Sequence, residues 1–228
     1  MRRLPPRALE VTLWVVAVVL LGIYGWVYLE RSVYQSYQSW AFERKLDGQP
    51  ASVMQFLAAN LSGGASGPGG AGRHRKDELR KFTAPEKTAP VLPQQAVIGR
   101  IEIPRIGVRG MVLEGTSDAC LRRAIGHIEG TALPGQQGNI GLAGHRDTFF
   151  LGLKGIKEGD TIRIRTLDGT FTYKVESIRI VTPKEVDVLD PTPVPTLTLV
   201  TCYPFNFVGA APDRYIVQAR EVRPAPGS

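Results

Sequence analysis

The sequence predicts a mainly β protein: one small β-barrel domain with short helices, preceded by an N-terminal transmembrane helix and a linker. From residue 96 onward the chain divides into seven or eight short runs rich in Val, Ile, Thr and Tyr, bounded by Gly, Pro and Asp. Several runs alternate apolar and polar residues, which is typical of a strand with one buried face. Short strands with little helix over roughly 125 residues favour a closed or nearly closed barrel.

The transmembrane prediction comes from residues 11–29, VTLWVVAVVLLGIYGWVYL, which carry no charge. A helix of this length spans about 29 Å, close to the roughly 30 Å hydrocarbon core of a bilayer. Trp26 and Tyr28 suit the aromatic belt of a membrane interface. A cleaved signal peptide is the alternative, but its apolar part is usually shorter and is followed by a small-x-small cleavage site. No such site follows residue 29, so we expect an uncleaved signal-anchor.

Positive charge in front of this segment predicts its orientation, because short cytoplasmic segments are enriched in Lys and Arg. Residues 1–10 are therefore expected to be cytoplasmic and everything after residue 30 extracytoplasmic. The arginines concerned are Arg2, Arg3 and Arg7.

Residues 30–95 are expected to form an extracytoplasmic spacer between the membrane and the barrel domain. Parts of it have a helical pattern, which the residues DGQP at 47–50 interrupt. The stretch LSGGASGPGGAGRHRK that follows is a Gly-rich linker, and its composition is typical of a flexible coil. His74 lies within it and is expected to be a solvated linker residue. The folded domain then covers 96–222, and 223–228 form a tail.

The bulk composition excludes some classes of function. The net charge of +7 could indicate nucleic-acid binding, but the basic residues are scattered and the expected topology removes the domain from the cytoplasm. No CxxC or Cys/His cluster is present, so neither a metal site nor a cofactor is expected. Two cysteines occur, Cys120 and Cys202, and in an oxidising compartment they could form a disulfide. Cys120 lies in the short helical stretch SDACLRRAIG, capped by Ser117 or Asp118, and is expected to be buried.

Cys202 has a position that suits a nucleophile. It follows the strand-like run 196–201 and precedes Tyr203-Pro204, and Pro cannot donate to a β-ladder. Cys202 is therefore expected at the C-terminal end of a strand, held rigidly and still accessible. A buried cysteine acting as a small apolar residue is the alternative.

His145 and Arg214 are expected near Cys202. His145 ends another strand-like run, NIGLAG at 139–144, whereas His127 follows the short helix and is expected only to make structural hydrogen bonds. Arg214 opens the last strand. Because a loop of about ten residues lets this strand return antiparallel to the Cys202 strand, the two residues are expected at the same end.

Together these side chains predict acyl-transfer chemistry. A cysteine thiolate attacks a carbonyl, an imidazolium can protonate the leaving amine, and a guanidinium can stabilise the oxyanion or bind substrate carbonyls. The wider sequence around them resembles the sortase family. Thr198-Leu199-Val200-Thr201-Cys202 matches the Thr-Leu-x-Thr-Cys motif of that family at all four fixed positions. The strings GHRDTFF and TCYPFNFVGAAPDRY are most similar to class D sortases, and the similarity covers about residues 95–222.

The resemblance implies an eight-stranded sortase barrel with its active site at one mouth. It implies a transpeptidase that cleaves an LPxTG-like C-terminal sorting signal after Thr, holds the acyl group as a thioester on Cys202 and transfers it to an amine. The acceptor would belong to a cell-wall precursor or a pilin lysine. His145 would be the acid and base, Arg214 the oxyanion or substrate stabiliser, and Thr201 a weaker candidate for substrate binding. The expected location is the bacterial cell membrane, in a single pass.

Two alternatives remain open. An L,D-transpeptidase would carry Ser-x-Gly-Cys with an arginine almost adjacent, whereas this chain has Val-Thr-Cys-Tyr-Pro. A non-catalytic, membrane-tethered β-barrel binding module would be expected to have lost one of the three residues.

Some sortases bind calcium through clustered carboxylates in the loops between strands. In this sequence Glu129 is the only carboxylate residue between Cys120 and His145, so a calcium site is not expected there. Asp147 is expected to start a turn, and orienting His145 is the alternative.

Overall fold

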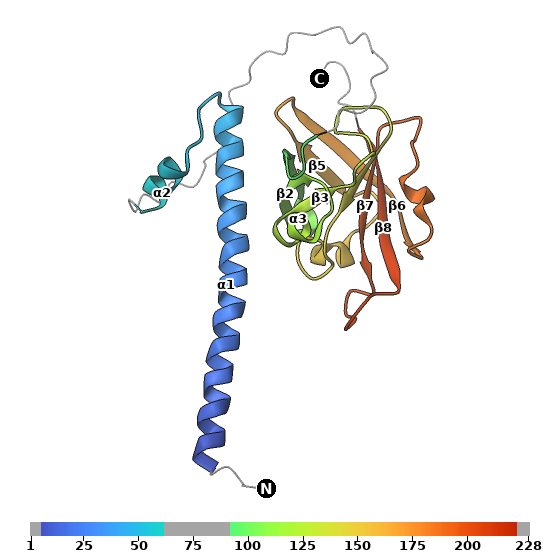
Figure 1. The fold of residues 1–228 in the computed structure, drawn as a ribbon. Helices are drawn as coiled ribbons and strands as arrows, with labels where there is room; N and C mark the ends of the chain where they lie inside the picture. The colour runs from blue at the N-terminus through green and yellow to red at the C-terminus, as the bar shows by residue number, and fades with distance from the viewer. Residues whose placement is uncertain (1–5, 62–91, 223–228) are drawn as a thin grey trace.

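A computed structural model describes residues 6–61 and 92–222, and within them eight strands close into a barrel. The strand order around the barrel is β1-β2-β3-β4-β7-β8-β6-β5 (Figure 1). The strands are β1 Val97–Ile103, β2 Val108–Glu114, β3 Ile125–His127, β4 Asn139–Ala143, β5 Thr161–Arg165, β6 Thr170–Val181, β7 Thr196–Tyr203 and β8 Asp213–Glu221. Short helices interrupt them: η1 Pro104–Ile106, α3 Asp118–Arg123, η2 Leu151–Gly155 and η3 Val186–Leu189. The prediction of an eight-stranded barrel with short helices is confirmed.

The β5–β6 hairpin shows how local sequence sets the register. Ile162 and Ile164 are buried while the residues between and beside them are exposed, so one face of β5 enters the core. The turn places Asp168-Gly169 between the strands, with Gly169 at φ 152. The Thr166 amide donates to the Gly169 carbonyl at 2.8 Å, which closes the turn. The hairpin predicted from the Asp-Gly pair is therefore present.

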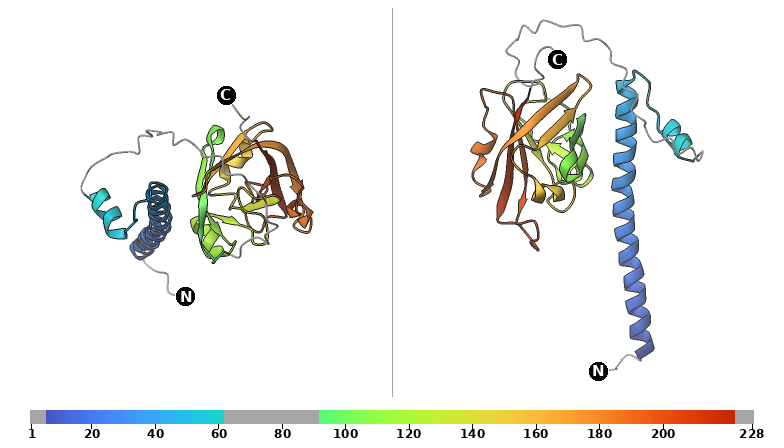
Figure 2. Two further views of the ribbon diagram at one scale, coloured as in Figure 1. Left: turned by 90° about the horizontal axis from the view of Figure 1, so that it is seen from above. Right: turned by 180° about the vertical axis from the view of Figure 1, so that it is seen from behind.

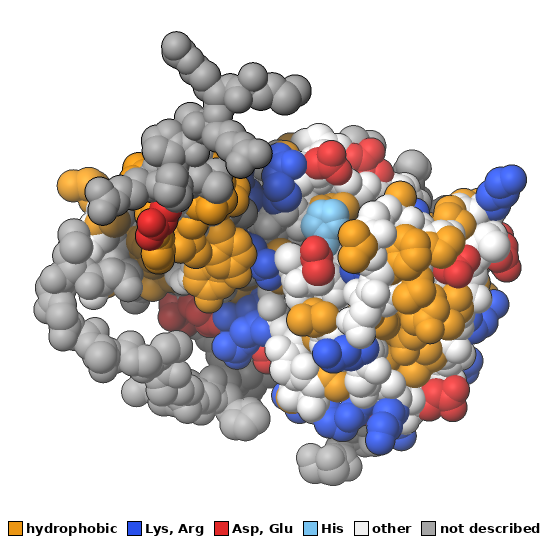
Figure 3. Space-filling view, turned by 90° about the horizontal axis from the view of Figure 1, so that it is seen from below, with side chains coloured by type: hydrophobic (Ala, Val, Ile, Leu, Met, Phe, Trp, Pro, Cys, Tyr) orange, Lys and Arg blue, Asp and Glu red, His pale blue; other side chains and the backbone are white. Residues whose placement is uncertain are grey.

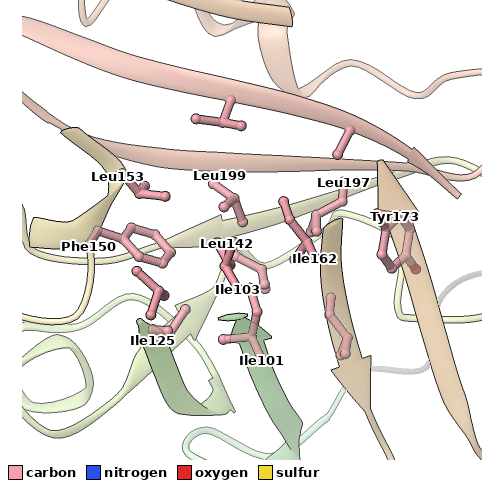
Figure 4. Packing of buried hydrophobic residues seen from close by; sticks show 14 of the residues in the cluster. Ile101, Ile103, Ile125, Leu142, Phe150, Leu153, Ile162, Tyr173, Leu197 and Leu199 are labelled. Carbon is pink, nitrogen blue, oxygen red and sulfur yellow. The ribbon is translucent and has the colours of Figure 1, made fainter. Parts of the chain in front are cut away.

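The hydrophobic core fills the inside of the barrel. Every strand contributes apolar side chains to it, and η2 closes one end with Leu153 beside Phe150. In Figure 4 the labelled side chains from β1, β3, β4, β5, β6 and β7 point toward one another between the strands. Burial of these side chains stabilises the barrel by about 25 cal/mol for each Å² of apolar surface removed from water. One face of each strand is therefore buried in the core, and the opposite face is the one that points out of the barrel.

The N-terminal part of the chain is one long helix, α1 Pro6–Leu46, that stands beside the barrel (Figures 1 and 2). It contains a stretch long and apolar enough to cross a membrane by length and composition, and none of that stretch is buried. The turn at Asp47-Gly48 ends the helix, with Gly48 at φ 69, and α2 Val53–Leu61 folds back so that Phe56 packs on Tyr37. The interruption predicted at 47–50 is confirmed.

The region expected to be a spacer begins differently from the prediction. Residues 30–46 continue α1 without a break, and they contact the barrel instead of separating it from the helix. Glu30 pairs with Arg123 at 2.6 Å, and the Arg31 guanidinium lies 4.2 Å from the centre of the Phe149 ring. The Gly-rich linker, His74, residues 1–5 and the tail 223–228 lie outside the described residues.

Candidate active site

Cys202 and Arg214 lie directly opposite each other in the sheet. β7 and β8 are antiparallel, and their register pairs Cys202 with Arg214 and Tyr203 with Asp213. Cys202 is the last residue but one of β7, and Pro204 follows the strand. The predicted antiparallel return of the last strand is confirmed. It sets the nucleophile candidate and the arginine side by side at one end of the barrel.

His145 reaches the same end through the pairing of β4 with β7. These strands are parallel, and Ala143 is in register with Val200. Beyond the end of β4, the Gly144 amide donates to the Val200 carbonyl at 3.2 Å, and the Thr201 hydroxyl donates to the Gly144 carbonyl at 2.7 Å. His145 follows Gly144 directly, and Cys202 follows Thr201 directly. We call this end of the barrel, where β4 and β7 end and β8 begins, the mouth.

Gly144 is required at this point for packing. A Cβ atom built there would lie 2.8 Å from the Phe150 ring, closer than real side chains approach one another. Phe150 is fully buried and its amide donates to the His145 carbonyl at 3.1 Å, so the chain turns tightly after His145. Asp147 lies exposed in this turn, in agreement with its predicted place.

The three candidate side chains share the outer face of the sheet. Along β7, Leu197 and Leu199 enter the core, so alternation places Thr198, Val200 and Cys202 on the outer face. The same rule places Arg214 on the face of Ile216, which packs in an outer cluster with Val181 and Val188. His145 continues the outward row of β4, opposite in phase to the core residues Ile140 and Leu142.

The segment around η3 covers part of this outer face and leaves the part next to the mouth open. The Val188 carbonyl accepts from Asn139 Nδ2 at 2.9 Å, and the Thr198 hydroxyl donates to Asn139 Oδ1 at 2.7 Å. Beyond this buried network, His145, Cys202 and Arg214 are all partly exposed. At the mouth end of β4, β7 and β8, these three side chains are therefore accessible from solvent.

Thr201 is buried, and its hydroxyl has a main-chain partner. Its side chain is 2% exposed, and its hydroxyl is used for the bond to Gly144. In this structure it holds the β4 end against β7 and does not face solvent. Thr201 lies on the inner face of β7 while Cys202 lies on the outer face, and a substrate contact by Thr201 stays a prediction.

Arg146 is a site residue that the sequence analysis did not identify. Its guanidinium donates to three backbone carbonyls of the β7–β8 loop, residues 204–212: Pro204 at 3.0 Å, Phe207 at 2.8 Å and Gly209 at 2.9 Å. The same group lies 5.9 Å from the centre of the Phe207 ring. Arg146 thus connects the residue after His145 to the loop after Cys202. No side-chain pattern could have indicated this, because all the acceptors are main-chain oxygens.

Arg214 is oriented by the same loop. Its Nη1 donates to the Asp213 carbonyl at 2.9 Å and to the Ala211 carbonyl at 3.3 Å. Both contacts use one terminal nitrogen, and the planar fork carries further N–H groups on Nη2 and Nε. The guanidinium is therefore held at the mouth with donors that a substrate carbonyl could use.

The two cysteines are both free thiols, in different surroundings. Cys202 is partly exposed at the mouth, and Cys120 is 1% exposed in a small cluster with Leu113 and Ala124. Burial raises the pKa of the Cys120 thiol, and the nearby Glu114 carboxylate raises it further. Cys120 is thus buried as predicted, and the alternative of a disulfide is not the state seen here.

His127 lies away from the mouth, in a buried polar cluster. Its Nδ1 is 2.7 Å from the Glu114 carboxylate and its Nε2 is 2.9 Å from the Ala132 carbonyl. Both ring nitrogens of His127 thus make structural hydrogen bonds, as the sequence analysis expected. Among the described residues, no group of three His, Cys, Asp or Glu side chains is arranged to hold a metal ion.

Comparison with known proteins gives one consistent family. The model of the sortase domain matches residues 101–222. Sortase D of Bacillus subtilis is 36% identical over 125 residues, which is 54% of this chain and 63% of that protein. Sortase A of Listeria monocytogenes is 32% identical over 129 residues, covering 55% of this chain and 58% of that protein. The chain thus spans about six tenths of the length of these curated relatives.

Solved structures agree with this result. A Sortase D5 transpeptidase of Clostridium perfringens superposes with a TM-score of 0.58 and 26% identity, covering 85% of this chain and 98% of that one. A lid mutant of sortase A from Corynebacterium diphtheriae superposes with a TM-score of 0.54 and 33% identity, covering 59% of this chain and 74% of that one. A curated relative and a solved relative are both D-type sortases, in line with the resemblance found in the sequence.

Proposed function

This chain belongs to the sortase family, and from that premise we propose that it is a membrane-anchored cysteine transpeptidase. Cys202 is the nucleophile, His145 the general acid and base, and Arg214 the group that stabilises the oxyanion or binds substrate carbonyls. The observation that carries this assignment is the register of the sheet. Cys202 pairs with Arg214, and the bonds from Gly144 to Val200 and Thr201 bring His145 beside them.

The proposed reaction has two acyl-transfer steps. The Cys202 thiolate attacks the carbonyl carbon of the threonine in an LPxTG-like sorting signal, and Arg214 stabilises the negative charge that develops on the carbonyl oxygen. His145 protonates the leaving amine, and the acyl group remains as a thioester on Cys202. An acceptor amine then attacks the thioester and gives up a proton to His145. A new amide bond forms, the bond to sulfur breaks, and the Cys202 thiolate and the protonated His145 are restored.

The substrates follow from the family and the anchor. We propose proteins with LPxTG-like C-terminal signals as acyl donors, and an amine of a cell-wall precursor or of a pilin lysine as acceptor. Sortases are cell-envelope proteins. The apolar stretch of α1 supports a single membrane pass, with the N-terminus in the cytoplasm and the barrel outside.

An acyl-enzyme experiment tests this function. The full chain in detergent micelles is incubated with peptides containing Leu-Pro-x-Thr-Gly or Leu-Pro-x-Thr-Ala, and intact-protein and peptide mass spectrometry locate any adduct. We expect a thioester on Cys202 that hydroxylamine removes, and its complete loss in Cys202→Ala. Cys120→Ala is the matched control and should keep the adduct. If no peptide of a signal library gives an adduct in the unchanged chain, the barrel is a non-catalytic binding module.

A further inference from the structure

The direction of α1 along the barrel defines which end of the barrel meets the membrane. At its residue 31 the helix contacts Phe149, which lies in the turn after His145 at the mouth. Further along, Glu43 of α1 pairs with Arg165, the last residue of β5 and the start of the hairpin at the opposite end of the barrel. The helix therefore runs from the mouth toward the opposite end as residue numbers rise. Its earlier, apolar part extends beyond the mouth (Figures 1 and 2).

The apolar part of α1 stops where contact with the barrel starts. Residues 11–29 carry no charge, and Glu30 and Arg31 are the first residues of α1 that bind the barrel. A helix that crosses a bilayer with these 19 residues has its outer end at the membrane surface. The mouth of the barrel then lies at the same surface and faces it.

The β7–β8 loop at the mouth has the composition of a segment that contacts lipid. Residues 204–212 read PFNFVGAAP and contain no charge. Val208 is 98% exposed and Phe207 is 44% exposed, while Leu151 of η2 adds a further exposed apolar side chain. Figure 3 looks at the molecule from below and shows hydrophobic side chains gathered on this end of the barrel. An exposed cluster of this kind in a soluble environment would be a liability for aggregation.

Arg146 satisfies the backbone groups of this loop from inside the protein. Its three bonds to the carbonyls of Pro204, Phe207 and Gly209 leave fewer main-chain acceptors that need water. Backbone polar groups that approach hydrocarbon are costly unless the protein itself pairs them. The loop thus presents apolar side chains outward and has its carbonyls bound inward.

We propose that the β7–β8 loop rests in the interfacial layer of the bilayer that holds α1, so that the Cys202 site opens at the membrane surface. The proposal rests on the anchor assigned under the proposed function.

Labels at three positions test the proposal in the full chain. Single cysteines are introduced as Val208→Cys, Leu167→Cys or Leu20→Cys in a Cys202→Ala background, labelled with the environment-sensitive dye NBD and reconstituted in nanodiscs of phosphatidylcholine and phosphatidylglycerol. Cys120 is buried, and Cys202→Ala alone measures any background labelling. Val208 and Leu167 are both exposed, so neither change should disturb folding, and Leu167 lies in the hairpin at the end opposite the mouth.

We expect nitroxide lipids to quench the Val208 label at least about two-fold more than the Leu167 label, as for a side chain in the membrane interface. Equal, weak quenching at both positions would overturn the docking of the loop. A second outcome would also overturn the proposal: the Val208 label is protected from aqueous iodide but is not quenched by nitroxide lipid. In nanodiscs holding one chain or two, this result would mean that the loop contacts protein. The Leu20 label separates the two proposals: if lipid quenches it and not Val208, only the docking is wrong, and if lipid does not quench it, the anchor is wrong.

Discussion

Cys120 and Cys202 are the same side chain in two surroundings, and their reactivity should differ accordingly. Cys120 is 1% exposed, and burial together with Glu114 raises the pKa of its thiol, which lowers its thiolate fraction. We predict that iodoacetamide alkylates Cys202 in the native chain and leaves Cys120 unmodified, while both react in denaturant. Peptide mass spectrometry measures this. Alkylation of Cys120 at the rate of Cys202 under native conditions would contradict the burial of the α3 cluster.

Tyr173 is a core residue whose hydroxyl has no hydrogen-bond partner among the described residues. Burial raises the pKa of this phenol above its usual value, and Glu221 adds to the effect. Because the unfolded chain ionises Tyr near pH 10 and the folded chain does not, folding stability is present below that pH and falls as the pH rises above it. We predict that Tyr173→Phe is neutral or stabilises by up to about 1 kcal/mol at pH 7.

Tyr173→Phe should also change how the free energy of unfolding falls at alkaline pH. In urea unfolding at pH 8 and pH 10.5, the unchanged chain should lose more stability between the two values than Tyr173→Phe does. Equal losses would show that the phenol does not couple ionisation to folding. Tyr203→Phe, at the partly exposed end of β7, is the control for removing a tyrosine hydroxyl outside the core.

At the scale of elements, the β7–β8 loop depends on Arg146. Removing the guanidinium releases three carbonyls at once, so Arg146→Ala should loosen the loop that follows Cys202 and precedes Arg214. We predict a fall in kcat/KM of about ten-fold or more, equivalent to roughly 1.4 kcal/mol. Amide hydrogen exchange should rise in residues 204–210 and remain unchanged in the β5–β6 hairpin. Arg146→Lys keeps the positive charge but loses the planar guanidinium with its several N–H donors. This variant should recover only part of the protection from hydrogen exchange.

If Arg146 were needed only for global stability, exchange would rise throughout the barrel and kcat/KM would follow the folded fraction. That outcome would remove its role as a positioning residue for the site.

The contact between α1 and the barrel contains an ion-pair network centred on Glu43. Its carboxylate pairs with Arg100, whose side chain is 11% exposed, and with Arg165 at 3.3 Å. Glu43→Gln leaves Arg100 with a weaker partner, and we predict a loss of about 1 kcal/mol in the free energy of unfolding, discounted for the partial exposure of Glu43. Glu102 pairs with both Arg100 and the exposed Arg109, so Arg109→Gln is the control: it breaks only the exposed pair and should cost less. Chemical denaturation of the two variants gives the comparison, and equal costs would argue against a special role for Glu43.

Most of the elements could be predicted from sequence because their patterns are local. Seven strands, the Asp-Gly hairpin and the α3 helix with its Ser117 cap all follow from runs of a few residues. β3 has only three residues, Ile125–His127, too few for alternation to show, and it is held by partners distant in sequence. Helical parts after residue 30 were predicted, but their continuity with the apolar helix and their packing on the barrel were not, because those contacts join residues distant in sequence.

The candidate site could be predicted in part for a similar reason. Cys202, His145 and Arg214 each stand at a strand end, and strand ends can be read from sequence. Arg146 and the burial of Thr201 depend on which main-chain atoms meet across the barrel, and those distances arise only after folding. Local patterns thus predicted the candidate residues, and the contacts around those residues needed the structure.

At the scale of the whole molecule, α1 carries the apolar stretch and also completes the surface of the barrel. Gln35 accepts from the Met111 amide at 3.1 Å and donates to the Arg123 carbonyl, and Tyr34 packs against the cluster around Cys120. These groups would be exposed to water if the helix were removed. The three candidate side chains, by contrast, stand on β7, β8 and the end of β4, although α1 also packs on Phe149 in the turn after His145.

We therefore predict that a chain starting at residue 30 is more stable than one starting at residue 92, with equal turnover of a soluble signal peptide. Loss of the α1 contacts should cost about 2 kcal/mol, which lowers Tm by roughly 5–10 °C for a domain of this size. Differential scanning fluorimetry and a peptide-transfer assay at 20 °C measure the two quantities. Gln35→Ala in the longer chain should reproduce part of the Tm difference, since it removes both bonds while leaving the rest of α1 docked. An equal Tm for both chains would mean that α1 does not pack on the barrel in solution. Lower turnover in the shorter chain at a temperature where both are folded would mean that α1 shapes the active site as well as the barrel's stability.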